Sequence, residues 1–204
     1  VGVIGGMGPD ATVDLMQRVI CATPAKDDAD HIHLLVDNNP KVPSRIAALV
    51  DGDGQSPEPV LVQMAQNLER AGANLLAIPC NTAHAYLESI QNAVAIPVLD
   101  MIQLTANRLT DLSPRPETVG IVASSAVLKA ELYGKVLERQ GLDIVLPTVV
   151  DQDTVMSLIK KVKSGQVSKL DHQRFSNVIN CLADSGAQAI AVACTDLSVM
   201  GRDN

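Results

Sequence analysis

Two cysteines stand where a pair of proton-transfer groups could act. Cys80 follows the apolar run 74–79, and Cys194 follows the apolar run 188–193. A free thiol titrates near pH ~8.5, so a modest fall in its pKa makes it a base near neutrality. Two thiols on opposite faces of a carbon acid could remove a proton from one side and return one to the other. Such a reaction inverts a stereocentre and needs no redox cofactor.

The alternative for each cysteine is a buried and inert side chain, because free Cys often behaves as a small hydrophobe. Cys21 and Cys181 lie inside helical patterns, and we assign both to this structural role. The sequence contains no C-x-x-C pair, so we expect no structural zinc site and no metal ligands. A chain with this many core residues does not need disulfides, which indicates free thiols in a reducing, cytoplasmic setting.

The surroundings of the two singled-out cysteines repeat. Gly72 precedes Cys80 by eight positions, and Gly186 precedes Cys194 by the same eight. An internal duplication with small loop changes explains this match. A polar pair follows each cysteine, namely Asn81-Thr82 and Thr195-Asp196.

The elements that must position these residues alternate between strands and helices. Short, nearly continuous apolar runs predict strands that are buried on both faces of a parallel sheet. These runs are 1–5, 31–36, 74–79, 119–123, 143–149 and 188–193, with a further strand expected at 96–100. Helical periodicity lies between them, at 60–71, 126–140 and 171–184.

This alternation predicts an α/β fold of two doubly wound lobes with mostly parallel sheets, related by a pseudo-twofold axis. The first lobe spans residues 1–112 and carries Cys80, and the second spans 113–204 and carries Cys194. The proline-containing segment 111–116 marks the boundary. We expect the active site in the cleft between the lobes.

Ligands of such sheets bind outside the carboxyl ends of the strands, which is where both cysteines come. Asn, Thr and Asp are good N-cap residues, so we expect each thiol near the positive end of a helix, which favours the thiolate. His84 could raise the basicity of Cys80 or serve as a structural histidine. Asp196 could orient Cys194 or simply cap its helix.

Composition excludes several classes of partner. The net charge is −7, which repels nucleic acids and anionic membranes, and the few aromatic residues (two Tyr, one Phe, no Trp) do not provide base-stacking platforms. No apolar stretch approaches the length of a membrane span, and no segment is typical of a signal peptide. An anionic ligand therefore needs a locally built cationic site.

The glycine-rich start offers a rival interpretation as a nucleotide-binding loop. Residues 2–8 follow a predicted strand and precede a predicted helix, as a dinucleotide site requires. Their glycine spacing does not fit G-x-G-x-x-G, and Asp37 is a poor candidate for the acidic residue of such a site. A nucleotide-dependent enzyme remains an alternative.

At these residues the chain resembles the aspartate/glutamate racemase family, and within it the aspartate racemase branch. The order and spacing of the motifs match over essentially the whole chain, and the G-G-M-G-P start favours the aspartate branch. The motifs are Gly5-Gly6-Met7-Gly8-Pro9, Pro79-Cys80-Asn81-Thr82-Ala83-His84 and Ala193-Cys194-Thr195-Asp196.

The resemblance implies a homodimer that racemises a small acidic amino acid without pyridoxal phosphate, metal or nucleotide. It makes Cys80 and Cys194 the two bases, and it implies that the remaining site residues hold the substrate. These substrate-binding residues are Met7, Arg45, Asn81, Thr82, Ser124, Lys163 and Thr195. His84 and Asp196 are expected to support the two thiols.

Several positions depart from the family's usual pattern. Ala193 stands where Gly is usual, Asp196 where Glu is usual, and Ser124 where Thr is usual. The second half also ends at Asn204 without a counterpart of the strand expected at 96–100, so we expect a C-terminal tail to be missing from this sequence.

These departures keep other functions open. Glutamate or a broader range of amino acids could be the substrate. A thiol-dependent isomerase or decarboxylase on the same scaffold, and a non-catalytic dicarboxylate-binding protein, are the remaining alternatives.

Overall fold

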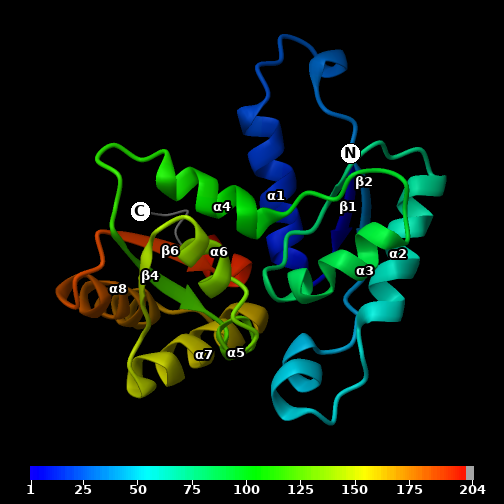
Figure 1. The fold of residues 1–204 in the computed structure, drawn as a ribbon. Helices are drawn as coiled ribbons and strands as arrows, with labels where there is room; N and C mark the ends of the chain where they lie inside the picture. The colour runs from blue at the N-terminus through cyan, green and yellow to red at the C-terminus, as the bar shows by residue number, and fades with distance from the viewer. Residues whose placement is uncertain (201–204) are drawn as a thin grey trace. The chain divides into compact units, whose positions relative to one another are not determined.

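The computed structural model describes residues 1–200, which form two compact units, Val1–Asp100 and Met101 onward (Figure 1). Residues 201–204, the end of the predicted second lobe, lie outside the described residues. The first unit contains β1 (Gly2–Gly5), α1 (Pro9–Ala22), η1 (Asp28–Asp30), β2 (Leu35–Asn38), η2 (Ala47–Asp51), α2 (Glu58–Arg70), β3 (Leu76–Ala77), η3 (Thr82–Tyr86) and α3 (Leu87–Asn92). The second contains α4 (Met101–Thr110), β4 (Thr118–Ala123), α5 (Ser125–Lys129), α6 (Gly134–Arg139), β5 (Asp143–Val145), α7 (Val149–Lys163), α8 (Lys169–Asp184), β6 (Ala189–Ala193) and α9 (Thr195–Val199).

The sheet of the first unit has the strand order β2-β1-β3, and both pairs are parallel. β1 lies in the centre, where Val3 pairs with Val36 on one side and with Ala77 on the other. Val3 and Ile4 are buried, as a parallel strand with both faces covered requires.

The sheet of the second unit repeats this topology. Its strand order is β5-β4-β6, again with parallel pairs, so the first strand of each unit lies between the second and the third. The repeated order confirms the predicted α/β class with parallel sheets and agrees with the duplication expected from the two cysteine motifs.

A glycine in each central strand shows the repeat in its packing. A Cβ on Gly2 would lie 3.0 Å from the Cβ of Ala73, and a Cβ on Gly120 would lie 3.2 Å from the Cβ of Ala187. Each alanine precedes the third strand of its unit. The missing side chain therefore lets the same loop pack closely on the central strand in both units.

Helices cover both faces of β4 in the second unit. Ile121 and Ala123 pack in a core with residues of α4, α5 and α6, whereas Val122 packs in a core with residues of α7, α8 and α9. This division follows the alternation of side chains along a strand. It gives the second unit its doubly wound arrangement.

In the first unit, α2 packs on one face of β1 and α1 on the other. The apolar residues of α2 recur on one helix face, and Leu61 and Met64 join Ile4 in one core cluster. Complete burial of a side chain such as Leu61 contributes about 1.5–3 kcal/mol. On the opposite face, Gly5 lies against Thr12 of α1.

The predicted strand 143–149 is wrong in its second half. The strand β5 ends at Val145, and α7, which the hydrophobic pattern did not predict, begins at Val149. Pro147 has no N–H to offer a ladder. Thr148 then caps α7, because its hydroxyl accepts a hydrogen bond from the backbone N–H of Asp151 at 3.2 Å.

The predicted helix 126–140 is two helices, α5 and α6. Between them Glu131 adopts a φ of 49°, in the left-handed region that ends a right-handed helix. Side-chain periodicity continued across the break because both short helices bury their apolar residues in the same core.

The first unit contains less regular strand than predicted near Cys80. The strand β3 comprises two residues of the predicted run 74–79. The strand expected at 96–100 contributes a single parallel bridge between Val98 and Leu76 of β3. Prolines at positions 79 and 97 remove backbone donors from these two segments, which explains their short pairing.

Helix α4 packs with the second unit. Ile102, Ala106 and Leu109 join the core cluster that includes Val119 of β4. These residues fall within the predicted lobe 1–112, whereas the compact units of the structure divide after Asp100.

Candidate functional site

The carboxyl ends of the strands gather the candidate residues within each unit. In the first unit, Met7 follows β1, Arg45 lies in the segment after β2, and Cys80 follows β3. In the second unit, Ser124 follows β4 and Cys194 follows β6. Because the strands of each sheet are parallel, these residues come at one edge of their own sheet, the edge at which α/β sheets bind ligands.

Cys80 is a buried thiol in the loop after β3. Its side chain is 5% exposed and belongs to the core cluster that contains Ile4 and Met7. Its backbone N–H donates to the carbonyl of Ile78 at 2.8 Å, which turns the chain tightly out of the strand. Met7, predicted to be a substrate-binding residue, is 3% exposed and lies in the same cluster.

His84 holds the backbone of the Cys80 loop. Its Nδ1 lies 2.9 Å from the carbonyl oxygen of Cys80, and because a carbonyl only accepts, Nδ1 carries the proton in this contact. Burial lowers the pKa of His84, and the carbonyls of Cys80 and Leu99 and the charge of Asp100 oppose this shift. The structure therefore gives His84 a positioning contact with the loop of the first thiol.

The predicted helix caps beside the thiols are wrong in part. Asn81 occupies the N-cap position of η3, as predicted, but its backbone is helical and its buried side chain makes no capping hydrogen bond. Thr82 is the first residue of η3 and is half-buried. In the second unit Cys194 itself occupies the N-cap position of α9, and Thr195 is the first helical residue.

Arg45 has hydrogen-bonding capacity to spare. Its Nη1 donates to the carbonyls of Val42 at 3.1 Å and Pro43 at 2.8 Å, while its buried Nε has no hydrogen-bond partner. Among residues 1–200 no ion pair involves Arg45. Burial and the charge of Glu58 raise the pKa of Tyr86, and the charge of Arg45 opposes this rise. Arg45 is therefore close enough to act electrostatically on η3, the element that follows Cys80.

Ser124 and Cys194 leave the second sheet from neighbouring positions, because Ala123 pairs with Ala193 in the register of β4 and β6. Both side chains are buried, at 5% and 7% exposed. The Ser124 hydroxyl accepts a hydrogen bond from a backbone N–H of α5, so this side chain is the cap of that helix. Cys194 packs in the core cluster on the α7 side of the sheet.

Lys163 and Asp196, which the sequence analysis placed in separate roles, form an ion pair with each other. Lys163 Nζ lies 3.3 Å from Asp196 Oδ2, and the side chains are 40% and 8% exposed. Asp196 comes two positions after Cys194, so the pair brings the ammonium of α7 to the segment that carries the second thiol. This contact, rather than a helix cap, is the role that the structure shows for Asp196.

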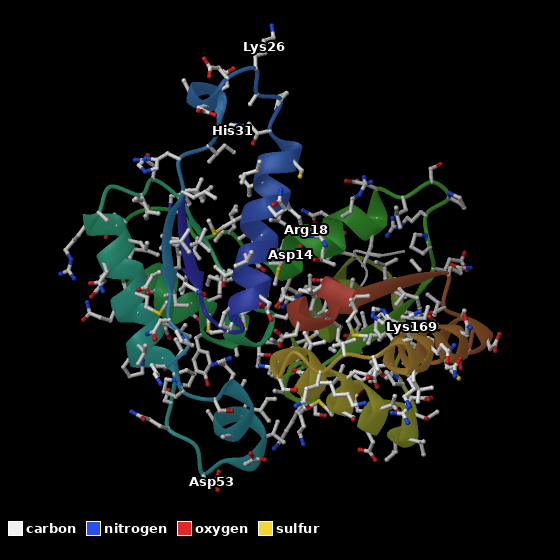
Figure 2. The ribbon with its side chains drawn as sticks, turned by 180° about the vertical axis from the view of Figure 1, so that it is seen from behind. Asp14, Arg18, Lys26, His31, Asp53 and Lys169 are labelled. Atoms are coloured by element: carbon white, nitrogen blue, oxygen red, sulfur yellow. The ribbon has the colours of Figure 1, made fainter. Side chains whose placement is uncertain are left out.

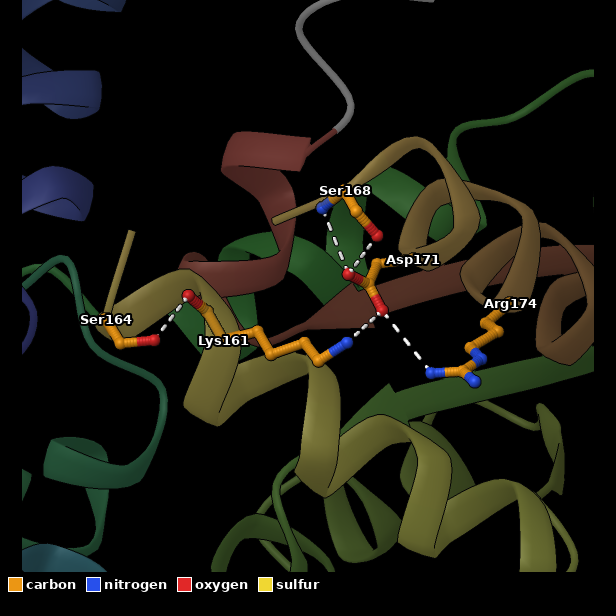
Figure 3. Close-up of polar contacts among 5 residues, drawn as sticks. All are labelled: Lys161, Ser164, Ser168, Asp171 and Arg174. Carbon is orange, nitrogen blue, oxygen red and sulfur yellow. Dashed lines mark hydrogen bonds and ion pairs between the residues drawn. The ribbon is translucent and has the colours of Figure 1, made fainter. Parts of the chain in front are cut away.

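The buried carboxylate of Asp171 fixes α8 against α7 (Figure 3). Asp171 accepts hydrogen bonds from Lys161 Nζ at 2.6 Å and from the hydroxyl of Ser168 at 2.6 Å. Arg174 Nη1 lies 3.5 Å from Asp171 Oδ1. These contacts, led by the one with Lys161, hold the pKa of Asp171 far below its ordinary value. Because Lys161 precedes Lys163 on the same helix, the cluster also helps to fix the helix end that carries Lys163.

Two assignments made from helical patterns are wrong. Cys21 and Cys181, expected to be buried, are exposed, whereas Cys80 and Cys194 are buried. Asp14 is 5% exposed and pairs with Arg18 at 2.9 Å, one turn along α1 (Figure 2). The four-residue spacing of this pair was the available signal in the sequence.

The described residues contain neither a candidate metal site nor a helix that could span a membrane. Within residues 1–200, no group of three or more His, Cys, Asp or Glu side chains could hold a metal ion. None of the helices in that part of the chain has the length and apolar character needed to cross a membrane.

A family model described as Asp/Glu/Hydantoin racemase matches residues 4–203. The chain belongs to this family. Membership makes it an isomerase of the racemase type, and it confirms the resemblance drawn from the three sequence motifs.

Individual members of the family agree with this assignment. The structure of Picrophilus torridus aspartate racemase has a TM-score of 0.87 and 31% sequence identity, over 98% of this chain and 82% of that one. The broad specificity amino-acid racemase RacX of Bacillus subtilis (strain 168) is 29% identical over 98% of this chain and 86% of its own length. A Francisella tularensis glutamate racemase in complex with D-glutamate, at 20% identity and a TM-score of 0.64, shares the fold over 98% of this chain and 70% of that one.

Proposed function

We propose that this chain racemises an acidic amino acid, aspartate foremost, by moving the α-proton between Cys80 and Cys194 without a cofactor. One cysteine acts as a thiolate and takes the α-proton, becoming a thiol. The other acts as a thiol and gives its proton to the opposite face of the carbanion, becoming a thiolate. The product is the opposite enantiomer, and the reverse reaction restores both cysteines.

One observation carries this proposal: the buried cysteines are the two that end equivalent strands. Cys80 and Cys194 follow the third strand of two units with the same topology, whereas the other two cysteines are exposed on helices. Placement of two similar acid–base groups at ligand-binding edges suits a reaction that needs the same chemistry on both faces of one carbon. The mechanism requires the two units to present these thiols to one substrate.

Cationic and polar residues support an anionic substrate. Arg45 has a buried Nε without a partner, and a guanidinium suits the planar carboxylate. Lys163 would exchange part of its contact with Asp196 for a substrate carboxylate. We propose that these side chains act with the remaining predicted substrate ligands, which are Met7, Asn81, Thr82, Ser124 and Thr195. Stabilisation of the carboxylates as charge develops at the α-carbon is the main electrostatic task of such a site.

A broad-specificity racemase is the second candidate, because RacX, a protein named as a broad specificity amino-acid racemase, is similar over 98% of this chain. The two candidates differ in which amino acids exchange their α-proton. We further propose a homodimer, on the resemblance, and a reducing cytoplasmic setting, which the four free cysteines support.

Exchange of the α-proton in D₂O tests the proposal. We expect the protein to incorporate deuterium into L-aspartate and to form D-aspartate. A panel of L-glutamate and neutral amino acids separates the narrow from the broad candidate, and a panel of dicarboxylic acids detects an isomerase or a decarboxylase. Binding of aspartate without exchange would identify a non-catalytic binding protein and refute the proposed function.

Cysteine variants test the two-thiol mechanism. Cys80→Ser and Cys194→Ser should each lower the racemisation rate by about 10²-fold or more, because each removes one acid–base group. Cys21→Ser is the matched control, since Cys21 is exposed and lies on α1, and it should retain the full rate. Full activity in Cys80→Ser would show that a single thiol suffices and that the mechanism is wrong.

A further inference from the structure

Gln152 is a polar residue at the carboxyl edge of the second sheet that neither the motifs nor the proposed mechanism uses. It lies near the start of α7, where its Nε2 donates to the carbonyl of Ala123 at 3.0 Å and to the hydroxyl of Ser125 at 3.2 Å. These two partners flank Ser124. The amide of Gln152 is therefore held against the segment where β4 ends.

The contact with Ala123 fixes the orientation of this amide. A backbone carbonyl can only accept, so the NH₂ group faces it and Oε1 points away from it. Oε1 is buried and has no hydrogen-bond partner. Within residues 1–200, the other buried side-chain nitrogen or oxygen in this state is Nε of Arg45. Buried polar atoms are nearly always paired with protein groups, water or a ligand, so this acceptor has the capacity for a donor from outside the chain.

An amino-acid substrate supplies such a donor. Arg45 and Lys163, the charged residues proposed for its carboxylates, can only donate hydrogen bonds, and the buried carboxylate of Asp196 keeps a contact with Lys163, which lies 3.3 Å from it in the structure. The α-ammonium group needs an acceptor, and Gln152 Oε1 is the buried side-chain oxygen left without a donor in the described part of the chain. Resting on the proposed function, we propose that Gln152 Oε1 accepts a hydrogen bond from the substrate α-ammonium group and so selects amino acids over plain dicarboxylates.

The strand register supports this position. Ala123, which anchors Gln152, pairs with Ala193, and Cys194 follows directly. A substrate nitrogen bound at Gln152 is thereby held at the end of the strand next to that of Cys194. The α-carbon is bonded to this nitrogen, so the contact would keep the reacting carbon close to the second thiol.

A comparison of aspartate with succinate isolates the contact. Succinate has the two carboxylates of aspartate and a hydrogen in place of the ammonium group. In Gln152→Met, which keeps the side-chain length and removes the acceptor, the KM for aspartate should rise about 10-fold or more, because a hydrogen bond to a charged group is lost. The inhibition constant of succinate should change less than about 2-fold, since it makes no such bond.

Two further variants separate this role from a structural one. Gln152→Glu keeps an acceptor oxygen but has no N–H for the carbonyl of Ala123, so it should prefer aspartate over succinate more strongly than Gln152→Met does, without reaching the wild-type KM for aspartate. Gln63→Met, at an exposed position on α2, is the matched control and should leave both constants unchanged. Equal weakening of aspartate and succinate in Gln152→Met, or no change in either, would overturn the inference.

The failure of this inference is distinguishable from failure of the proposed function. If the wild-type protein exchanges no α-proton, the racemase proposal fails, and titration calorimetry of Gln152→Met with aspartate and succinate still tests the ammonium contact. If the wild-type protein binds neither compound, the inference fails as well. If racemisation is normal and Gln152→Met keeps the wild-type KM for aspartate, only the inference fails.

Discussion

Replacement of Gly6 by Ala tests whether the glycine-rich start is dictated by contact with the backbone. Gly6 follows β1 with a φ of +93°. A Cβ at this position would lie 2.3–2.5 Å from the backbone C, O and N atoms of Asn39. Gly72 offers a matched control in the same unit, because it has a φ of +96° and nothing within 4 Å of the added Cβ.

The magnitude follows from two separate costs. A Cβ in the left-handed region costs about 1–2 kcal/mol, and the smaller entropy of the unfolded Ala chain returns about 0.4–1 kcal/mol. Gly72→Ala should therefore destabilise the protein by about 1 kcal/mol. At Gly6 the backbone of Asn39 must also move by roughly 1 Å to reach ordinary contact, and overpacking of this kind costs about 1–3 kcal/mol more.

Urea unfolding followed by far-UV circular dichroism measures the difference. We expect Gly6→Ala to lose about 2–4 kcal/mol of unfolding free energy, which is a large part of the roughly 5–15 kcal/mol that stabilises a typical domain. Equal losses in Gly6→Ala and Gly72→Ala would refute the reasoning, because they would show that only the backbone conformation matters at Gly6.

Two further predictions concern charged groups of the second unit. The difference in unfolding free energy between wild type and Asp171→Asn should be constant from about pH 5 to 7 and should shrink as the pH falls below about 4. The reason is that a carboxylate with a depressed pKa in the folded state stabilises the fold only above the pKa it has in the unfolded chain. Urea midpoints across this pH range measure the difference, and a difference that grows in acid would contradict the prediction. Lys163→Met should destabilise the protein by about 1–3 kcal/mol because it leaves a buried carboxylate alone. Asp196→Asn should cost less than about 1 kcal/mol because Lys163 is partly exposed. Urea unfolding measures both losses, and a larger loss in Asp196→Asn than in Lys163→Met would show that Asp196 is less buried than the structure indicates.

Local pattern was sufficient to place a strand before each of the two thiols, although β3 is shorter than the run that predicted it. The apolar runs before Cys80 and Cys194 predicted strands at both places, and the equal spacing from Gly72 and Gly186 predicted the duplicated topology. These signals are readable because a strand buried on both faces needs apolar residues at successive positions, and the same demand arises in both copies.

Local pattern was insufficient where the same side chains fit more than one structure. Val149 and Val150 are apolar and β-branched, yet they begin α7 because Pro147 stops the ladder and Thr148 caps the helix. Helical periodicity also ran through Glu131, whose positive φ divides α5 from α6. In each case one residue's backbone geometry outweighed the hydrophobic pattern around it.

The sequence by itself determined the family, the two repeated α/β units and the pair of cysteines at strand ends. Only the tertiary structure decided that these two thiols are buried and the other two exposed, that Lys163 pairs with Asp196, and that Gln152 reaches the end of β4. The physical reason is that composition and periodicity report how a segment meets its own sheet or core. Burial, ion pairs and orphaned acceptors arise between segments distant in sequence, and only the folded chain brings them together.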